Sequence, residues 1–152
     1  MNFHGWTALL STIAFTGVWM MTAPNGAASP PSGATGSTFS CQVTGVHDGD
    51  GPIYCATGEK IRLTAVAARE TDGSCSPGHP CPDATAEEAR AELDRLTRGQ
   101  TLQCEKTGTS YSRVTAWCWR PDGTEVNCAM VRSGKAAYWE KYDTAGRLCQ
   151  GN

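Results

Sequence analysis

An arginine and a glutamate near the middle of the chain have the types and the spacing to act on a phosphate ester. Arg62 lies in a run of alternating apolar and polar residues, and Glu70 follows in the loop beyond the end of that run. Arginine offers a planar fork of donors to phosphate oxygens, and a carboxylate orients or deprotonates an attacking water. The alternative interpretation is a solvated or structural arginine, since charged side chains are normally exposed.

The element that must position this pair is a strand that begins at Lys60 and alternates through Val66. Ile61 and Leu63 take one face of the run, which is the period of a half-buried strand. Arg62 is therefore expected to point away from the apolar face, toward the rim where the glutamate follows.

The rest of the chain supplies further strands and two helices. The clearest helix is expected over 86–98, because Thr85 and Glu88 make a capping-box pattern before an apolar stripe. Five short strands with this helix between the third and the fourth indicate a mainly β fold with helices (α+β). The architecture expected is a five-stranded, partly open barrel of the oligonucleotide/oligosaccharide-binding (OB) type. The expected strands are 39–45, 53–55, 60–66, 101–106 and 113–119, and a short helix over 126–133 follows the fifth.

Composition limits the kind of partner. The chain has 152 residues, of which 39% are hydrophobic and 18% charged, as in a globular domain rather than a disordered one. The formal net charge of −2 gives no bulk attraction to nucleic acid. Phosphate binding would therefore be local, at a few placed arginines.

The first residues have the pattern of an export signal. Residues 1–28 contain an apolar run followed by small residues and are expected to be a signal peptide, with cleavage or retention as an anchor left open. Residues 29–38 are expected to be a flexible linker rich in Pro, Gly, Ser and Thr, and residues 39–152 form the domain. We expect a secreted or periplasmic protein, because eight cysteines suit an oxidising compartment.

The cysteines are expected to pair. Cys75 and Cys81 bracket a Pro/Gly-rich loop and are expected to close on each other, and a metal site with His79 between them is the weaker alternative. A second pair, Cys118 with Cys128, would join the fifth strand to the short helix. The pairing of the other cysteines is left open.

Four motifs in order give the chain a family resemblance. They are Asp48-Gly49-Asp50, Ile61-Arg62-Leu63 followed by Glu70-Thr71, Ser110-Tyr111-Ser112-Arg113, and the run from Val126 to Gly134. With these motifs, residues 42–142 resemble the thermonuclease (micrococcal nuclease-like) family. The cysteine content is similar to that of its exported bacterial branch.

The resemblance implies a nuclease, which hydrolyses the phosphodiester bonds of DNA and RNA with calcium. It implies that Asp50 binds the ion, that Arg62 and Arg113 hold the scissile phosphate, and that Glu70 activates the attacking water. It also implies that Tyr111 lies beside the phosphate. Calcium prefers several hard oxygen ligands, which agrees with a carboxylate at the first of these positions. A monomer is expected.

The chain departs from the family pattern at the metal site. Ala67 stands where the family has a second acidic ligand, Arg69 where it has proline, and Gly51 where it has threonine. Asp48 is interpreted mainly as a residue that caps the turn, with contact to the ion through water as the alternative. The loss of one carboxylate keeps a second hypothesis open, a non-catalytic module that binds nucleic acid or phosphate.

Aromatic residues follow the fifth strand and the short helix. They pack in a core more often than they stack on bases, and Tyr142 is the strongest candidate for stacking because it lies near a nucleotide-contacting tyrosine of the family. The group consists of Trp117, Trp119, Tyr138, Trp139 and Tyr142.

Overall fold

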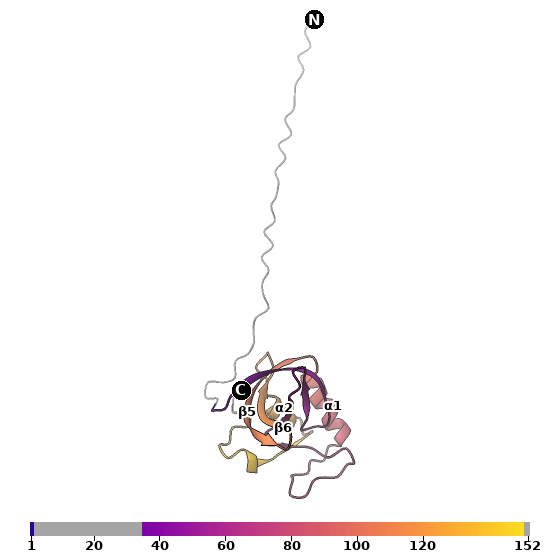
Figure 1. Cartoon of the computed structure of the whole chain (residues 1–152). Coiled ribbons are helices and arrows are strands. Elements are labelled where there is room, and N and C mark those ends of the chain that lie inside the picture. The colour runs from indigo at the N-terminus through magenta and orange to yellow at the C-terminus, as the bar shows by residue number, and fades with distance from the viewer. Residues whose placement is uncertain (2–34, 151–152) are drawn as a thin grey trace.

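The chain folds into a closed β-barrel with helices packed against it (Figure 1). The structure is a computed structural model that describes residue 1 and residues 35–150. The mixed α+β class expected from the sequence is therefore confirmed. In chain order the elements are β1 (Thr38–Val46), β2 (Ile53–Cys55), β3 (Lys60–Leu63), β4 (Val66–Ala67), α1 (Ala86–Thr97), β5 (Thr101–Ser110), β6 (Arg113–Trp119), α2 (Val126–Arg132), β7 (Ala137–Tyr138) and the 3-10 helix η1 (Glu140–Tyr142).

The barrel strands follow the order β1-β2-β3-β6-β5, and β5 pairs back onto β1. All neighbouring pairs are antiparallel except β3 with β6, which run parallel. A helix lies between the third and fourth barrel strands and another follows the fifth, which confirms the OB-like architecture. The barrel is closed where a partly open one was expected, because residues 38–42 of β1 pair with residues 101–105 of β5.

The helix α1 begins where its capping residues predict. The Thr85 hydroxyl accepts a hydrogen bond from the Glu88 N–H at 3.2 Å, and the Glu88 carboxylate accepts one from the Thr85 N–H at 2.9 Å. Figure 1 shows the helix along the outside of the barrel, where its apolar stripe, including Leu93 and Leu96, is buried. It ends at Thr97, one residue earlier than expected.

The strand that carries Arg62 is shorter than expected. It stops at Leu63, and Ala65 turns the chain with a φ of 59°, a left-handed conformation that L-residues rarely adopt. The chain then forms β4, which pairs with β7 to make a small second sheet. The sequence did not predict this sheet, since strands of two residues carry no readable alternation.

The domain starts before residue 39, its expected beginning. β1 includes Thr38, and the N–H groups of Thr35 and Gly36 donate to the Glu105 carboxylate at 2.8 and 3.0 Å. The end of the expected linker is therefore part of the fold. Apart from residue 1, the expected signal peptide and residues 29–34 of the linker lie outside the described residues.

All eight cysteines form disulfides, so no thiol is free. The predicted bridge between Cys75 and Cys81 is present, whereas the predicted pairing of Cys118 with Cys128 is wrong. Cys118 instead lies directly opposite Cys104 in the β5–β6 ladder, close enough for a bridge. The four bridges join Cys41 to Cys55, Cys75 to Cys81, Cys104 to Cys118, and Cys128 to Cys149.

Disulfides of this number are compatible with an extracellular or periplasmic protein, because they persist in oxidising compartments. Among the helices formed by the described residues, none has the length and apolar character needed to cross a bilayer.

Candidate active site

A cavity of about 610 Å³ lies between β3, the β5–β6 hairpin and the loop that follows β4. Its wall carries carboxylates, guanidinium groups and aromatic rings from segments far apart in the sequence. The structure brings together here every residue for which the sequence predicted a role in substrate or metal binding or in catalysis. These residues are Asp50, Arg62, Glu70, Tyr111, Arg113 and Tyr142, and Asp48 joins them.

The two aspartates are placed by a tight turn between β1 and β2. The Asp50 N–H donates to Asp48 Oδ1 at 3.1 Å, so Asp48 caps the turn as expected. Gly49 is needed because a Cβ there would lie 2.3 Å from the Cβ of Ala89 on α1. Gly51 has a φ of 123°, which favours glycine. Close packing of the turn against α1 therefore fixes where the carboxylates point.

Arg62 makes an ion pair with Asp50 across the cavity wall. Both side chains are largely buried, with 13% of Arg62 and 9% of Asp50 exposed. The other Asp50 oxygen accepts from the Ala68 N–H at 3.3 Å. Arg62 thus leaves the apolar face of β3 as predicted, and its charge is balanced by the carboxylate expected to bind the metal.

Asp48 is in an electrostatically unfavourable position. Burial, and next the negative charge of Asp50, raise the pKa of Asp48 from 3.8 to about 7. Near neutral pH the pair therefore carries less than its full negative charge. A nearby cation would relieve the repulsion, and so the two aspartates suit a divalent ion.

The rest of the donor set is weak for a metal. Ala67, which the resemblance aligns with a second acidic ligand of the family, is fully buried and does not line the cavity. In residues 35–150, no three side chains of the His, Cys, Asp or Glu type gather closely enough to hold an ion by themselves. A divalent ion would accordingly need oxygen atoms from a substrate phosphate to complete its ligands.

The β5–β6 hairpin presents Arg113 beside Tyr111. Ser110 pairs with Arg113 across the hairpin, which leaves Tyr111 and Ser112 to form the turn. Tyr111 has a φ of 54° and is 97% exposed, and its ring centroid lies 5.9 Å from the Arg113 guanidinium carbon. Arg113 makes no ion pair with any residue from 35 to 150. It is therefore available to an anion at the mouth of the cavity.

Glu70 follows β4 and lies half-buried in the cavity wall. The Ser76 hydroxyl donates to Glu70 Oε1 at 2.7 Å, and no hydrogen bond from residues 35–150 reaches Oε2. The carboxylate is thus held by one oxygen, and the other is left for a water molecule.

The cavity also contains residues to which the sequence gave no specific role there, among them Ser76, His79 and Trp139. The His79 and Trp139 ring centroids lie 4.0 Å apart, and the Trp139 and Tyr142 rings meet edge-on at 4.6 Å. The aromatic character of Trp139 was visible in the sequence, but no local pattern told it from the other tryptophans. Trp117 and Trp119 are buried with Ala65, as the core interpretation predicted.

No protein-family model matches the chain. A curated protein similar to it is the succinoglycan biosynthesis protein ExoI of Rhizobium meliloti (strain 1021), which is 32% identical over 89 residues. The matched part covers 57% of this chain and 47% of that protein, so the match spans about half the length of the relative. The resemblance to thermonucleases stays a prediction beside these findings.

Proposed function

We propose that the protein is an exported phosphodiesterase that cleaves strands of DNA or RNA, as a nuclease of the thermonuclease type would. The observation that supports this most strongly is the convergence of Arg62, Arg113 and Glu70 on one cavity. A module that only bound phosphate would use the arginines, whereas it would have no evident need for the carboxylate.

Each group has a role that follows from its chemistry. Glu70 accepts the proton of the water that attacks phosphorus, through the oxygen that Ser76 leaves free. The ester P–O bond breaks as the new bond forms, and the leaving sugar oxygen takes a proton from solvent. The guanidinium groups of Arg62 and Arg113 donate to phosphate oxygens, on which negative charge builds as the new bond forms. Tyr111 and Tyr142, which are 97% and 53% exposed, offer their rings to the bases of the nucleic-acid strand.

A divalent ion, which we propose to be calcium, would be held by Asp50 and Asp48. When bound, it would neutralise charge on the phosphate. Asp50 is paired with Arg62 in this structure. A substrate phosphate would take over the contacts of Arg62 and leave Asp50 free for the ion, which links the two binding events.

We expect the protein to be a monomer outside the cytoplasm, where free nucleic acid is its substrate. Bulk electrostatic attraction contributes little at a net charge of −2, so we expect recognition at the cavity. Exposed rings accommodate unpaired bases more readily than a duplex, and so single strands are the expected substrate.

The first prediction tests the cavity residues. Hydrolysis of a fluorescent single-stranded oligonucleotide should require a divalent ion and stop in chelator. Arg62→Ala, Arg113→Ala and Glu70→Gln should each lower kcat by about a hundred-fold or more, because all three act on one transition state. Arg90→Ala and Glu87→Gln, on the exposed face of α1, are matched controls and should leave kcat unchanged. A native protein that binds the oligonucleotide but cleaves nothing with any divalent ion would disprove the phosphodiesterase.

A non-catalytic binding module is the second candidate. The ion pair between Arg62 and Asp50 favours it, as does the buried Ala67 in place of an acidic ligand. Under this alternative the oligonucleotide binds with similar affinity in chelator and in calcium, and Glu70→Gln binds as the native protein does. Because the curated relative is named for succinoglycan biosynthesis, succinoglycan belongs in the same binding assay.

A further inference from the structure

The loop between β4 and α1 forms one wall of the cavity. Its residues 72–82 stand out at the lower edge of the barrel in Figure 1, and the bridge between Cys75 and Cys81 closes it. Two of its side chains, Ser76 and His79, line the cavity. A loop that a disulfide closes therefore supplies part of the site.

The first contact of this loop is with Glu70. Ser76 donates to the carboxylate at 2.7 Å, while the Glu70 N–H donates to the Ser74 carbonyl at 2.9 Å. The Glu70 carbonyl also accepts from the Gly73 N–H at 2.8 Å. Both the backbone and the side chain of Glu70 are thus fixed by residues of the loop.

The second contact is on the aromatic side of the cavity. The His79 ring packs against the Trp139 ring at a centroid distance of 4.0 Å. The backbone N–H of His79 donates to the Ser76 carbonyl at 3.0 Å. Ser76 is therefore held between the Cys75–Cys81 bridge and His79, which itself packs against Trp139.

Arg69 ties the two ends of the loop together. Its Nε donates to the Pro82 carbonyl at 2.9 Å and its Nη1 to the Gly73 carbonyl at 2.9 Å. Proline could make neither bond. The arginine that departs from the family pattern thus joins the two ends of the loop.

We propose that Ser76 is a positioning residue that aims the Glu70 carboxylate, and that the Cys75–Cys81 bridge and Arg69 act through it. The inference rests on the proposed phosphodiesterase activity. A carboxylate on a flexible chain samples several rotamers, and a small misplacement of a catalytic group costs up to about a hundred-fold in rate. Neither Ser76 nor the bridge needs to contact the substrate for this effect.

The test compares steady-state kinetics on the single-stranded oligonucleotide. Ser76→Ala should lower kcat by about ten-fold to a hundred-fold while KM changes less than about two-fold, because substrate binding belongs to other residues. Ser76→Thr keeps the hydroxyl and should recover most of kcat. Ser40→Ala is the matched serine control, since Ser40 is exposed on β1, does not line the cavity and has a hydroxyl that contacts Gln103, so kcat should not change.

The bridge is tested in the same assay. The double variant Cys75→Ala/Cys81→Ala should lower kcat as much as Ser76→Ala does. Adding Ser76→Ala to the double variant should lower kcat little further, because both changes remove the same restraint on the Glu70 carboxylate. Circular dichroism checks that each variant stays folded. Losses that multiply would show that the bridge does not act through Ser76.

The outcomes separate this inference from the proposed function. If the native protein is active and Ser76→Ala has native kcat, the positioning role is wrong and the phosphodiesterase stands. If the native protein is inactive with every divalent ion, the phosphodiesterase is wrong, and a role for Ser76 in turnover falls with it.

Discussion

Asp48 couples the site to pH. Its pKa in the folded protein is raised to about 7, first by burial and then by Asp50, against 3.8 for the ordinary group. Between these values the folded state binds more protons than the unfolded state, so the contribution of Asp48 to stability falls as pH rises. Calcium would compete with that proton, and its affinity should rise over the same range.

The second prediction concerns this fall in stability with rising pH. Asp48→Asn should remove part of the decline in the free energy of unfolding between about pH 4 and pH 7, measured by urea titration at several pH values. The buried Glu125, whose pKa is also raised to about 7, adds a slope of its own that is common to both proteins. The exposed Asp83→Asn is the control. Equal slopes in the native protein and Asp48→Asn would contradict the assignment.

The third prediction tests whether a carboxylate at position 67 would strengthen calcium binding. Ala67 is fully buried, and its neighbour Ala68 donates to Asp50, so Ala67→Asp would add a carboxylate near that aspartate. Without calcium the new charge is uncompensated and should lower Tm by several degrees. With calcium, a unit charge at about 4 Å from a divalent ion contributes about 2 kcal/mol in water-like surroundings, and desolvation offsets part of it.

We therefore expect Ala67→Asp to bind calcium about ten-fold more tightly in a calorimetric titration and to regain its Tm when calcium is added. Ala67→Asn has the same shape without the charge and is the matched control. If both variants respond to calcium alike, Ala67 is not at the metal position.

Residue types and spacing suggested Arg62 and Glu70, and the resemblance to thermonucleases added the other arginine, the aspartate and the tyrosines that line the cavity. Their positions follow strand ends and turns, whose placement an alternating pattern and a glycine-rich turn predict. Ser76 and His79 were not predicted because their loop lacks such a pattern. Where a disulfide-closed loop packs depends on its partner, here Trp139, and that residue lies about sixty positions further along the chain.

Among the elements, the acidic turn and α1 depend on each other through Gly49. A Cβ at this position would lie 2.3 Å from the Ala89 Cβ and 2.8 Å from the Ala68 Cβ. The helix and the loop beyond β4 therefore pack directly on the backbone of the turn. The same close contact sets the position of the aspartates on either side of the glycine.

The fourth prediction is that Gly49→Ala destabilises the protein by about 1 to 3 kcal/mol, the usual cost of overpacking a tight contact. Because the turn must move, activity should fall as well. Gly45→Ala is the control, since nothing lies within 4 Å of a Cβ there and its φ is not in the left-handed region. Thermal unfolding measures the loss of stability, and the oligonucleotide assay measures the loss of activity. If Gly49→Ala is as stable as the control, α1 can shift to make room for the added Cβ and the contact is not tight.

The major elements were predictable because each has a local signal. The capping box of Thr85 and Glu88 predicted the start of α1, and the alternating residues predicted the barrel strands. The bridge between Cys118 and Cys128 was predicted from proximity in sequence and is wrong. The cross-strand register that places Cys104 opposite Cys118 is a tertiary property, as is the reach of Cys128 to the C-terminal segment.

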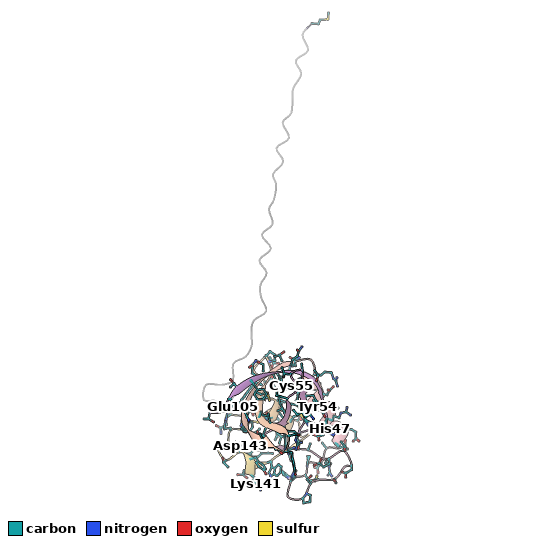
Figure 2. The ribbon with its side chains drawn as sticks, in the orientation of Figure 1. His47, Tyr54, Cys55, Glu105, Lys141 and Asp143 are labelled. Carbon is teal, nitrogen blue, oxygen red and sulfur yellow. A yellow bond between two sulfur atoms is a disulfide. The ribbon has the colours of Figure 1, made fainter. Side chains whose placement is uncertain are left out.

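At the scale of the whole molecule, both ends of the described domain meet at Glu105. This β5 residue is 1% exposed and accepts hydrogen bonds from Thr35, Gly36 and Arg147. Arg147 is held in turn by its N–H bond to Asp143 and lies over the Trp117 ring. Figure 2 shows Glu105 and Asp143 on the same side of the barrel. The C-terminal segment, fixed by the bridge at Cys149, therefore covers the side of the barrel where β1 begins.

The last prediction removes the cation from this cluster. Arg147→Ala leaves the buried Glu105 carboxylate without its guanidinium partner, which should cost about 3 kcal/mol. This is the lower end of the usual range, because 31% of the Arg147 side chain is exposed and two N–H donors to Glu105 remain. Urea unfolding at pH 7 measures the loss. Glu105→Gln in the Arg147→Ala background removes the buried charge and should recover part of the stability.

The pH dependence of the same pair gives an independent test. The Arg147 guanidinium holds the pKa of Glu105 below its usual 4.5, so the stability from this pair is complete above that value and is lost as pH falls through the folded pKa. Arg147→Ala should therefore flatten the acid side of the stability profile, below the usual pKa of 4.5 for a glutamate. A variant that kept the native acid limb would mean that the backbone N–H groups alone stabilise the carboxylate, and that the C-terminal segment is held by its disulfide and not by charge.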